Sequence, residues 1–291
     1  MSSIPSNHAV HGVVRRSRSN LAFALACLPR GRRDDMYSFY AFCRVVDDIA
    51  DDEGIPLEKR IAGLQRWRDV IHGRATNLSE LEEAVTGVQE RHQPPVQEME
   101  EIIEGVSMDL QPMHYATWAE LERYCYRVAG CVGLVSIRIF GCAMPQSRDY
   151  ALALGNALQI TNILRDIHGD YQNGQRIYLP QDEIATAGYT EADLARGKMN
   201  DAFQALMTQQ IARARYYYTR ATDLLAPEDR IPLSASETMR RIYSETLDLL
   251  DNDGRRVFDK RYRLPHWRKV QIVGSAWING VWARAWKSHV A

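Results

Sequence analysis

The stretch Leu158-Gln-Ile-Thr-Asn-Ile-Leu-Arg-Asp-Ile-His-Gly-Asp170 decides the fold of this chain. It contains no Pro and a single Gly, so it predicts a helix. Asn162, Asp166 and Asp170 are spaced four residues apart and therefore lie on one face of that helix. Apolar residues between them anchor the helix in a core: Ile160, Ile163, Leu164 and Ile167. Because close carboxylates repel each other, this face indicates a bound divalent cation, and oxygen ligands favour magnesium.

A second acidic stripe lies upstream, in Phe39-Tyr-Ala-Phe-Cys-Arg-Val-Val-Asp-Asp-Ile-Ala-Asp-Asp52. Asp47 and Asp51 are again four residues apart, and each stripe carries an arginine, Arg44 here and Arg165 in the first. This pattern indicates a site where metal ions bridge carboxylates to a diphosphate and guanidinium groups hold its oxygens. On spacing alone, solvated helix faces with arginine–carboxylate pairs explain the two stripes about equally well.

Composition narrows the classes of protein. The chain has 291 residues, of which 45% are hydrophobic and 25% charged, enough for a large core. A net charge of −1 argues against a nucleic-acid partner. The five cysteines are odd in number and lack CxxC spacing, so we expect reduced thiols and a cytoplasmic location. No apolar run is long enough to span a membrane.

Periodicity predicts an all-α chain with a single domain over 1–291, in which 1–14 form a loose arm. The basic and apolar stretch 15–28 predicts a first helix rather than a signal peptide. Further helices are expected near 33–52, 56–73, 78–91, 95–110, 118–140, 201–225, 234–252 and 265–288, with a loop at 171–176.

The helix expected at 118–140 carries a ridge of small side chains that includes Ala129, Gly130 and Gly133. Glycine in mid-helix costs stability relative to alanine, so the ridge has a purpose. It either lets a neighbouring helix pack closely or leaves room for an elongated ligand, and spacing alone favours packing.

Four motifs follow one another along the chain: Asp47-Asp-Ile-Ala-Asp51, Tyr124-Cys-Tyr-Arg-Val-Ala-Gly-Cys-Val-Gly133, Asn162-Ile-Leu-Arg-Asp166 and Arg176-Ile-Tyr-Leu-Pro180. Together they resemble the squalene/phytoene synthase family, the head-to-head prenyl diphosphate synthases, over about residues 21–269. The resemblance implies an isoprenoid-synthase helical bundle around a central apolar cavity. Two prenyl diphosphates would bind there, with their heads between the acidic helices and their tails in a tunnel.

The resemblance also implies roles for individual residues. Two or three Mg²⁺ ions would be held by Asp47, Asp51, Asn162, Asp166 and Asp170. The diphosphates would be clamped by Arg44 and Arg165, and the reacting centre lined by Tyr40, Tyr124, Tyr178 and Tyr243. The tunnel would run beside Ala129, Gly130 and Gly133, which favours the ligand-room interpretation of the ridge. Relatives commonly carry Gly-Glu-Asp where this chain has His168-Gly169-Asp170, and the loop before Tyr178 is one residue longer here.

The implied reaction is a Mg²⁺-dependent condensation that gives a cyclopropylcarbinyl diphosphate. Within the family, the chain most resembles bacterial presqualene diphosphate synthases, which join two farnesyl diphosphates. A phytoene synthase that joins two geranylgeranyl diphosphates is the close alternative. No nicotinamide fingerprint is present, so we expect no NADPH-dependent completion to squalene, although squalene synthases bind NADPH without such a motif. A non-catalytic helical scaffold is the alternative from another class.

The C-terminal stretch 265–288 is rich in Trp and basic residues. We expect a helix that caps the bundle; the alternative is a helix lying on the inner face of the membrane. The sequence indicates no oligomeric state.

Overall fold

The computed structural model describes residues 10, 12–13, 24–111 and 114–275. Within these ranges the chain is helical, and β pairing is limited to one parallel bridge between His114 and Ile177. The helices are α3 (Arg30–Asp51), α4 (Leu57–Ile71), α5 (Glu80–His92), α6 (Val96–Met108), α7 (Trp118–Cys125), the π-helix η1 (Tyr126–Gly130), α8 (Cys131–Phe140), α9 (Ser147–Gln172), α10 (Gln181–Thr186), α11 (Glu191–Ala195), α12 (Asp201–Asp223), α13 (Ser234–Asn252) and a last helix over 266–275. The all-α prediction is confirmed. The arm at 1–14 and the helix at 15–28 lie largely outside the described residues.

Helix boundaries follow from local chemistry. Prolines directly precede α3, α4, α6 and α10, where a fixed φ and a missing N–H do no harm. Ser79 and Glu82 form a capping box at the start of α5. Gly141 ends α8 at a φ of 72°, which a residue without Cβ adopts without strain. The sequence analysis did not predict the short helices α10 and α11, and it predicted a regular α-helix where the structure has η1.

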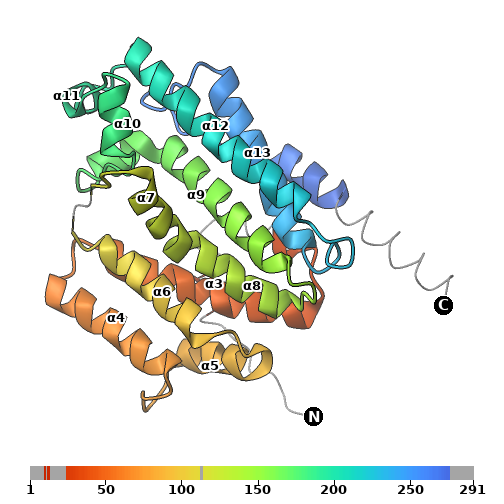
Figure 1. Ribbon diagram of the computed structural model, residues 1–291. Coiled ribbons are helices and arrows are strands. Elements are labelled where there is room, and N and C mark those ends of the chain that lie inside the picture. The colour runs from red at the N-terminus through yellow and green to blue at the C-terminus, as the bar shows by residue number, and fades with distance from the viewer. Residues whose placement is uncertain (1–9, 11, 14–23, 112–113, 276–291) are drawn as a thin grey trace.

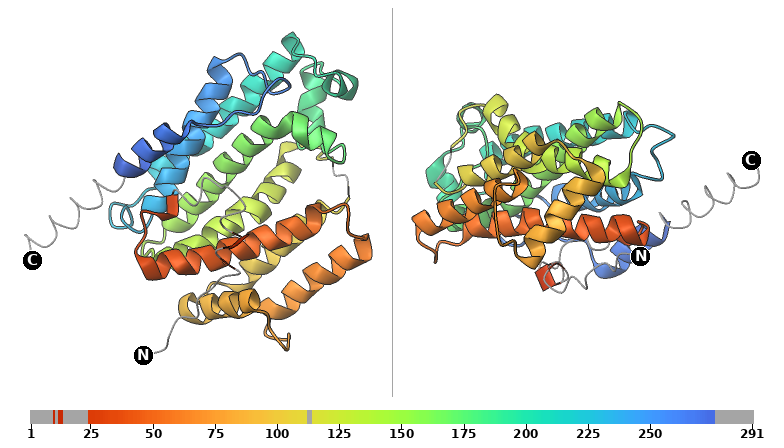
Figure 2. Two further views of the ribbon diagram at one scale, coloured as in Figure 1. Left: turned by 180° about the vertical axis from the view of Figure 1, so that it is seen from behind. Right: turned by 90° about the horizontal axis from the view of Figure 1, so that it is seen from below.

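Helix α9 runs through the middle of the molecule (Figure 1). It packs against α12 and α13 on one side and against η1 and α8 on the other. Seen from behind, α3 lies between α9 and the outer group of α4, α5 and α6 (Figure 2). One main cluster of buried side chains extends from α3 to α13. The two helices with acidic stripes, α3 and α9, therefore face a common interior.

Candidate active site

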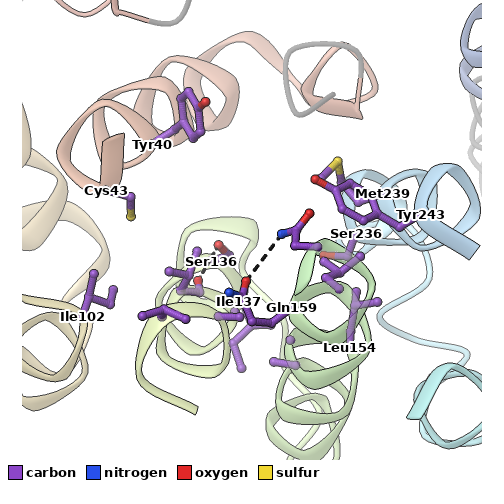
Figure 3. Close-up of a pocket in the computed structure, with 18 of the residues that line it drawn as sticks. Tyr40, Cys43, Ile102, Ser136, Ile137, Leu154, Gln159, Ser236, Met239 and Tyr243 are labelled. Carbon is purple, nitrogen blue, oxygen red and sulfur yellow. Dashed lines mark hydrogen bonds between the residues drawn. The ribbon is translucent and has the colours of Figure 1, made fainter. Parts of the chain in front are cut away.

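A cavity of about 380 Å³ lies between α3, α6, α8, α9 and α13 (Figure 3). Its polar end holds Arg44, Asp47, Asp109, Asn162 and Tyr243, and its walls are mostly apolar. Each of these helices contributes lining residues three or four positions apart, from one end of the cavity to the other. The difference in residue number between two lining residues of one helix therefore gives their separation along the cavity. On α3 the lining runs from Asp47 to Met36, eleven residues that span roughly 16 Å at 1.5 Å per residue. The opposite end is lined by large side chains: Met36, Phe140 and Tyr150.

The first acidic stripe borders the polar end of the cavity. Arg44 donates a hydrogen bond from Nη1 to Asp47 Oδ2 at 2.9 Å, and Arg176 donates from Nη1 to Asp51 Oδ1 at 2.7 Å. Burial and the neighbouring Asp51 carboxylate raise the pKa of Asp47 to about 7. The stripe thus holds more negative charge than its arginines neutralise.

The second stripe lies on α9. Arg165 donates from Nε and Nη2 to the two oxygens of Asp166, at 3.0 and 2.5 Å. Arg261 donates to the same two oxygens at 2.7 Å each. Burial alone would raise the pKa of Asp166, but these hydrogen bonds outweigh it and lower the pKa. The pKa of Asp170 is raised to about 7, mainly by burial and to a smaller extent by the negative charge of Asp166.

The donor set between the stripes fits Mg²⁺. Asn162 lines the cavity, and its Oδ1 is buried yet accepts no hydrogen bond. A buried amide oxygen without a partner is costly, and together with carboxylates it is the kind of ligand that Mg²⁺ prefers. Within 24–111 and 114–275, no three acidic, His or Cys side chains are already gathered at metal-binding distances. Arginines hold Asp47, Asp51 and Asp166 instead, so metal binding would displace these pairs.

Asp109 is a site residue that sequence analysis did not assign. It follows α6, lines the cavity, and accepts hydrogen bonds from Tyr124 Oη at 2.8 Å and Tyr178 Oη at 2.9 Å. The rings of Tyr124 and Tyr178 stack with centroids 5.2 Å apart, and Tyr115 packs against both. Burial raises the pKa of Asp109. Its only sequence signal was an acidic residue between Met108 and Leu110, both apolar.

The fold accommodates both departures from the motifs of the resembled family, His168 and the longer loop before Tyr178. The His168 ring packs edge-on against Phe258, with centroids 5.7 Å apart. The longer loop turns at Gly174, where φ is 81°, and delivers Arg176 to Asp51. Tyr178 still reaches Asp109. Asp170, Arg176 and Tyr178 line a small pocket of their own next to this point rather than the main cavity.

The π-helix η1 aligns two parts of the wall. Tyr124 and Gly133 are nine residues apart, which in a regular α-helix would place them roughly 180° apart, on opposite faces. Both nevertheless line the cavity, because the wider turn of η1 absorbs one residue between them. Ala129 lines the cavity as well, whereas Gly130 packs against Leu152 of α9 and does not.

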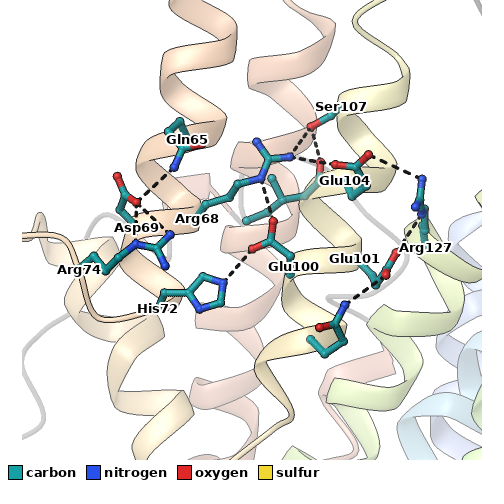
Figure 4. A network of polar contacts seen from close by, with 12 residues as sticks. Gln65, Arg68, Asp69, His72, Arg74, Glu100, Glu101, Glu104, Ser107 and Arg127 are labelled. Carbon is teal, nitrogen blue, oxygen red and sulfur yellow. Dashed lines mark hydrogen bonds and ion pairs between the residues drawn. The ribbon is translucent and has the colours of Figure 1, made fainter.

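Neighbouring helices approach η1 closely. A Cβ on Gly105 of α6 would lie 2.7 Å from Arg127 Cβ, and one on Gly155 of α9 would lie 2.9 Å from Gly130 N. Arg127 Nε also donates to Glu101 Oε2 at 2.9 Å, within a polar network that continues through Glu104 to Arg68 of α4 (Figure 4). The small-residue ridge thus serves helix packing at Gly130 and at Gly133, where a Cβ would lie 3.0 Å from Ala151 O of α9, and it borders the cavity at Ala129 and Gly133.

The remaining predicted residues lie around the polar end. Tyr40 of α3 and Tyr243 of α13 line the cavity from opposite sides (Figure 3). Arg165 lies beside Tyr243, with Cζ 6.0 Å from the ring centroid. The predicted polar residues that line the cavity are Tyr40, Arg44, Asp47, Tyr124, Asn162 and Tyr243, whereas Arg165 and Tyr178 contact residues of its lining and Asp170 lines the neighbouring small pocket. An apolar cavity with charged side chains at one end is what a diphosphate with a prenyl tail would require.

Comparison with known proteins agrees with this geometry. The family model for squalene/phytoene synthase matches residues 14–268. The phytoene synthase of Arthrospira platensis is 34% identical over 264 residues, 84% of each chain. The 15-cis-phytoene synthase of Synechococcus elongatus is 35% identical over 260 residues, 84% of this chain and 83% of that one.

Solved structures give a second comparison. A dehydrosqualene synthase superimposes with a TM-score of 0.80 at 26% identity, covering 93% of this chain and 94% of that one. The squalene synthase of Alicyclobacillus acidocaldarius gives 0.76 at 25% identity, covering 85% and 94%. This chain therefore belongs to the squalene/phytoene synthase family of prenyltransferases.

Proposed function

We propose that this enzyme catalyses the Mg²⁺-dependent head-to-head condensation of two farnesyl diphosphates to presqualene diphosphate. The observation that carries the proposal is the cavity itself, which joins an apolar tunnel to a polar end flanked by two acidic stripes and the unpartnered Asn162 oxygen. Mg²⁺ would be held by Asp47 and Asp51 on α3 and by Asn162, Asp166 and Asp170 on α9. When bound, Mg²⁺ neutralises diphosphate charge and so favours departure of the diphosphate.

The residues of the chain support each stage of this reaction. Arg44 and Arg165 hold diphosphate oxygens while the allylic C–O bond of one substrate breaks and diphosphate leaves with the electron pair. The double bond of the second substrate attacks the allylic cation, and a proton passes to the released diphosphate as the cyclopropane ring closes. The apolar walls exclude water, which would otherwise trap the cation. Tyr40, Tyr124, Tyr178 and Tyr243 place polarisable rings and hydroxyls near it.

The depth of the cavity supports the shorter substrate. With carbon–carbon bonds of about 1.5 Å in a zigzag, the twelve-carbon backbone of a farnesyl chain spans about 14 Å and the sixteen-carbon backbone of a geranylgeranyl chain about 19 Å. From Asp47 to Met36 the tunnel offers roughly 16 Å. The farnesyl chain fits this depth, and the longer chain would have to displace Met36 or Phe140.

Phytoene synthesis from two geranylgeranyl diphosphates is the second candidate. It is favoured by the names of the curated relatives, which are phytoene synthases at 34% and 35% identity. The names of the two solved neighbours favour a squalene-type product instead, at lower identity.

A product analysis tests the proposal. The purified enzyme is given Mg²⁺ with farnesyl or geranylgeranyl diphosphate, with and without NADPH, and the extracts are analysed by mass spectrometry. We expect a C30 cyclopropyl diphosphate from farnesyl diphosphate that NADPH leaves unchanged. A C40 hydrocarbon from the longer substrate alone would select phytoene synthesis, a C30 hydrocarbon formed only with NADPH would add the reductive step, and no condensation of either substrate would support the scaffold alternative.

A further inference from the structure

The end of the cavity farthest from Asp47 and Asn162 is lined by large side chains from three helices. Met36 belongs to α3, Phe140 to α8 and Tyr150 to α9. Each of these three residues is buried, with 3% or less of its surface exposed. A prenyl tail longer than the cavity has to displace side chains at this end. The side chain that resists displacement most strongly therefore limits the length of tail that the cavity accepts.

Tyr150 is anchored at this end by polar contacts that cross from α9 to α13. Its Oη donates a hydrogen bond to Glu237 Oε1 at 2.9 Å. Arg240 in turn donates from Nε to both carboxylate oxygens of Glu237, at 2.9 and 3.0 Å, and from Nη2 to Oε2 at 2.9 Å. The side chains of Glu237 and Arg240 are only 20% and 21% exposed, so water competes weakly for these bonds. We call Tyr150, Glu237 and Arg240 the Tyr150 anchor.

The other two side chains at this end have no such anchor. Met36 has a flexible thioether side chain that repacks readily. The ring of Phe140 cannot form hydrogen bonds and is held by packing. Moving the Tyr150 ring out of its place would also take a donor away from the largely buried Glu237 carboxylate, which makes the movement more costly. Tyr150 is therefore the most strongly fixed of the three.

The position of Tyr150 on α9 corresponds to a definite tail length. Asn162 lines the polar end of the cavity, and Tyr150 lines the opposite end twelve residues earlier in the same helix. Twelve residues of α-helix span about 18 Å, compared with roughly 16 Å along α3. Both lengths exceed the backbone of a farnesyl chain, about 14 Å, and fall short of that of a geranylgeranyl chain, about 19 Å.

We propose that Tyr150 determines the length of the prenyl tail that the enzyme accepts, and that Glu237 and Arg240 are positioning residues that hold its ring in place. The inference rests on the proposed function for the kind of tail, but it can be tested by binding alone. If the Tyr150 anchor only tied α9 to α13, its loss would lower stability and leave the preference between tails unchanged.

Binding of unreactive substrate analogues to the full chain tests the proposal. Farnesyl and geranylgeranyl thiodiphosphate are titrated calorimetrically in the presence of Mg²⁺, and the Kd of the longer analogue is divided by that of the shorter. Wild-type protein should bind the farnesyl analogue more tightly. Tyr150→Ala should lower the Kd ratio by about tenfold or more, because room for a single methylene already changes discrimination by about that factor.

Two further variants remove the anchor but keep the ring. Tyr150→Phe lacks the hydroxyl, and Glu237→Leu lacks the acceptor. Each should lower the Kd ratio by about threefold to tenfold, the net worth of an ordinary hydrogen bond. Glu237→Gln retains an acceptor oxygen for the Tyr150 hydroxyl, so its Kd ratio should stay closer to that of wild type than the ratio of Glu237→Leu does.

Tyr217→Phe is the matched control. Tyr217 Oη also donates to a carboxylate, Glu122 Oε1, at 2.5 Å, but Tyr217 does not line the cavity. Its loss should lower the Tm and leave the Kd ratio unchanged. A shift in the ratio as large as that of Tyr150→Phe would overturn the proposal, because general loosening of the bundle would then explain both variants.

Two other results would also overturn the proposal: equal binding of both analogues by wild-type protein, or an unchanged Kd ratio in Tyr150→Ala. If Tyr150→Ala does not fold, Tyr150→Phe and Glu237→Leu decide in the same way. Condensation of farnesyl diphosphate is assayed in parallel. A shifted Kd ratio without condensation would contradict the proposed function alone, and condensation with an unshifted ratio would contradict the role of Tyr150 alone.

Discussion

At the scale of single residues, the site depends on acidic side chains held by partners of two kinds. Asp47, Asp51 and Asp166 are held by arginines that diphosphate could take over. Asp109 is held by tyrosine hydroxyls that stay with the protein. The first group is thus suited to exchange partners when metal and substrate bind, whereas Asp109 is suited to fix Tyr124 and Tyr178 throughout the reaction.

Asp166→Asn tests the metal-ligand role. It keeps the size of the side chain but removes a charge, and we expect the condensation rate to fall by more than about 100-fold, since even groups that only orient metal ligands are worth about 10–100-fold. Asp52→Asn is the matched control, because Asp52 is exposed at the end of α3 and should leave the rate unchanged. Equal rates for the two variants at saturating Mg²⁺ would contradict the assignment.

Asp109→Asn tests whether Asp109 fixes Tyr124 and Tyr178 through their hydroxyl groups. The amide accepts more weakly than a carboxylate and cannot serve both hydroxyls with acceptor oxygens, so we expect kcat to fall about tenfold with little change in KM. A double-mutant cycle with Tyr178→Phe gives the control. If Asp109 acts through Tyr178, the two effects should be less than additive. Full additivity would show that Asp109 acts independently of Tyr178.

At the scale of elements, η1 determines which residues of the segment α7–η1–α8 line the cavity. The π-helix fits only because Gly105 of α6 and Gly155 of α9 have no side chains where it is widest. Arg127 then ties it to Glu101 of α6. Substitutions that touch neither substrate nor metal should therefore disturb the site through this element.

Gly105→Ala tests that dependence. The added Cβ would meet Arg127 Cβ at 2.7 Å and Val128 Cγ1 at 2.8 Å, so we expect overpacking to lower the free energy of unfolding by about 1–3 kcal/mol. Gly169→Ala is the control, because nothing lies within 4 Å of its Cβ position and a helical alanine should raise stability by up to about 1 kcal/mol. Urea unfolding measures both variants. A neutral or stabilising Gly105→Ala would contradict the close packing around η1.

The sequence predicted the helices well where prolines and caps mark their starts, as at Pro56 and Ser79. It placed the acidic stripes on α3 and α9 because a four-residue spacing has the same meaning in any regular helix. The sequence did not predict η1, because one extra residue in a helical turn does not change the amino-acid composition from which a helix is predicted. It also missed Asp109 and Arg261, whose partners lie 15 to 95 residues away in the chain.

At the scale of the whole molecule, the proposed metal site and the stability of the fold are linked through charge. The pKa values of Asp47 and Asp170 are raised to about 7 by burial and by neighbouring carboxylates, so the folded chain without metal binds more protons than the unfolded chain between about pH 4 and 7. Its stability should therefore fall as pH rises through this window. Metal ligands must be deprotonated, so Mg²⁺ should restore the loss most strongly above pH 7.

Thermal unfolding with and without Mg²⁺ at pH 5.5 and pH 8 measures this linkage. We expect the Mg²⁺-induced rise in Tm to be larger at pH 8. Asp47→Asn removes one of the two titrating groups, so it should weaken both the decline with pH and the effect of Mg²⁺. A rise in Tm that is the same at both pH values, or larger at pH 5.5, would contradict the raised pKa values.

The most direct test of the account is a crystal structure of the enzyme with Mn²⁺ and a farnesyl thiodiphosphate, whose C–S bond does not ionise readily. We predict anomalous peaks between Asp47 and Asp51 of α3 and the Asn162, Asp166 and Asp170 side chains of α9. We also predict that Arg44 and Arg165 turn from carboxylates to diphosphate oxygens and that the farnesyl tail ends near Met36. Ligand bound elsewhere, or diphosphate bound with no metal between the two stripes, would contradict the account.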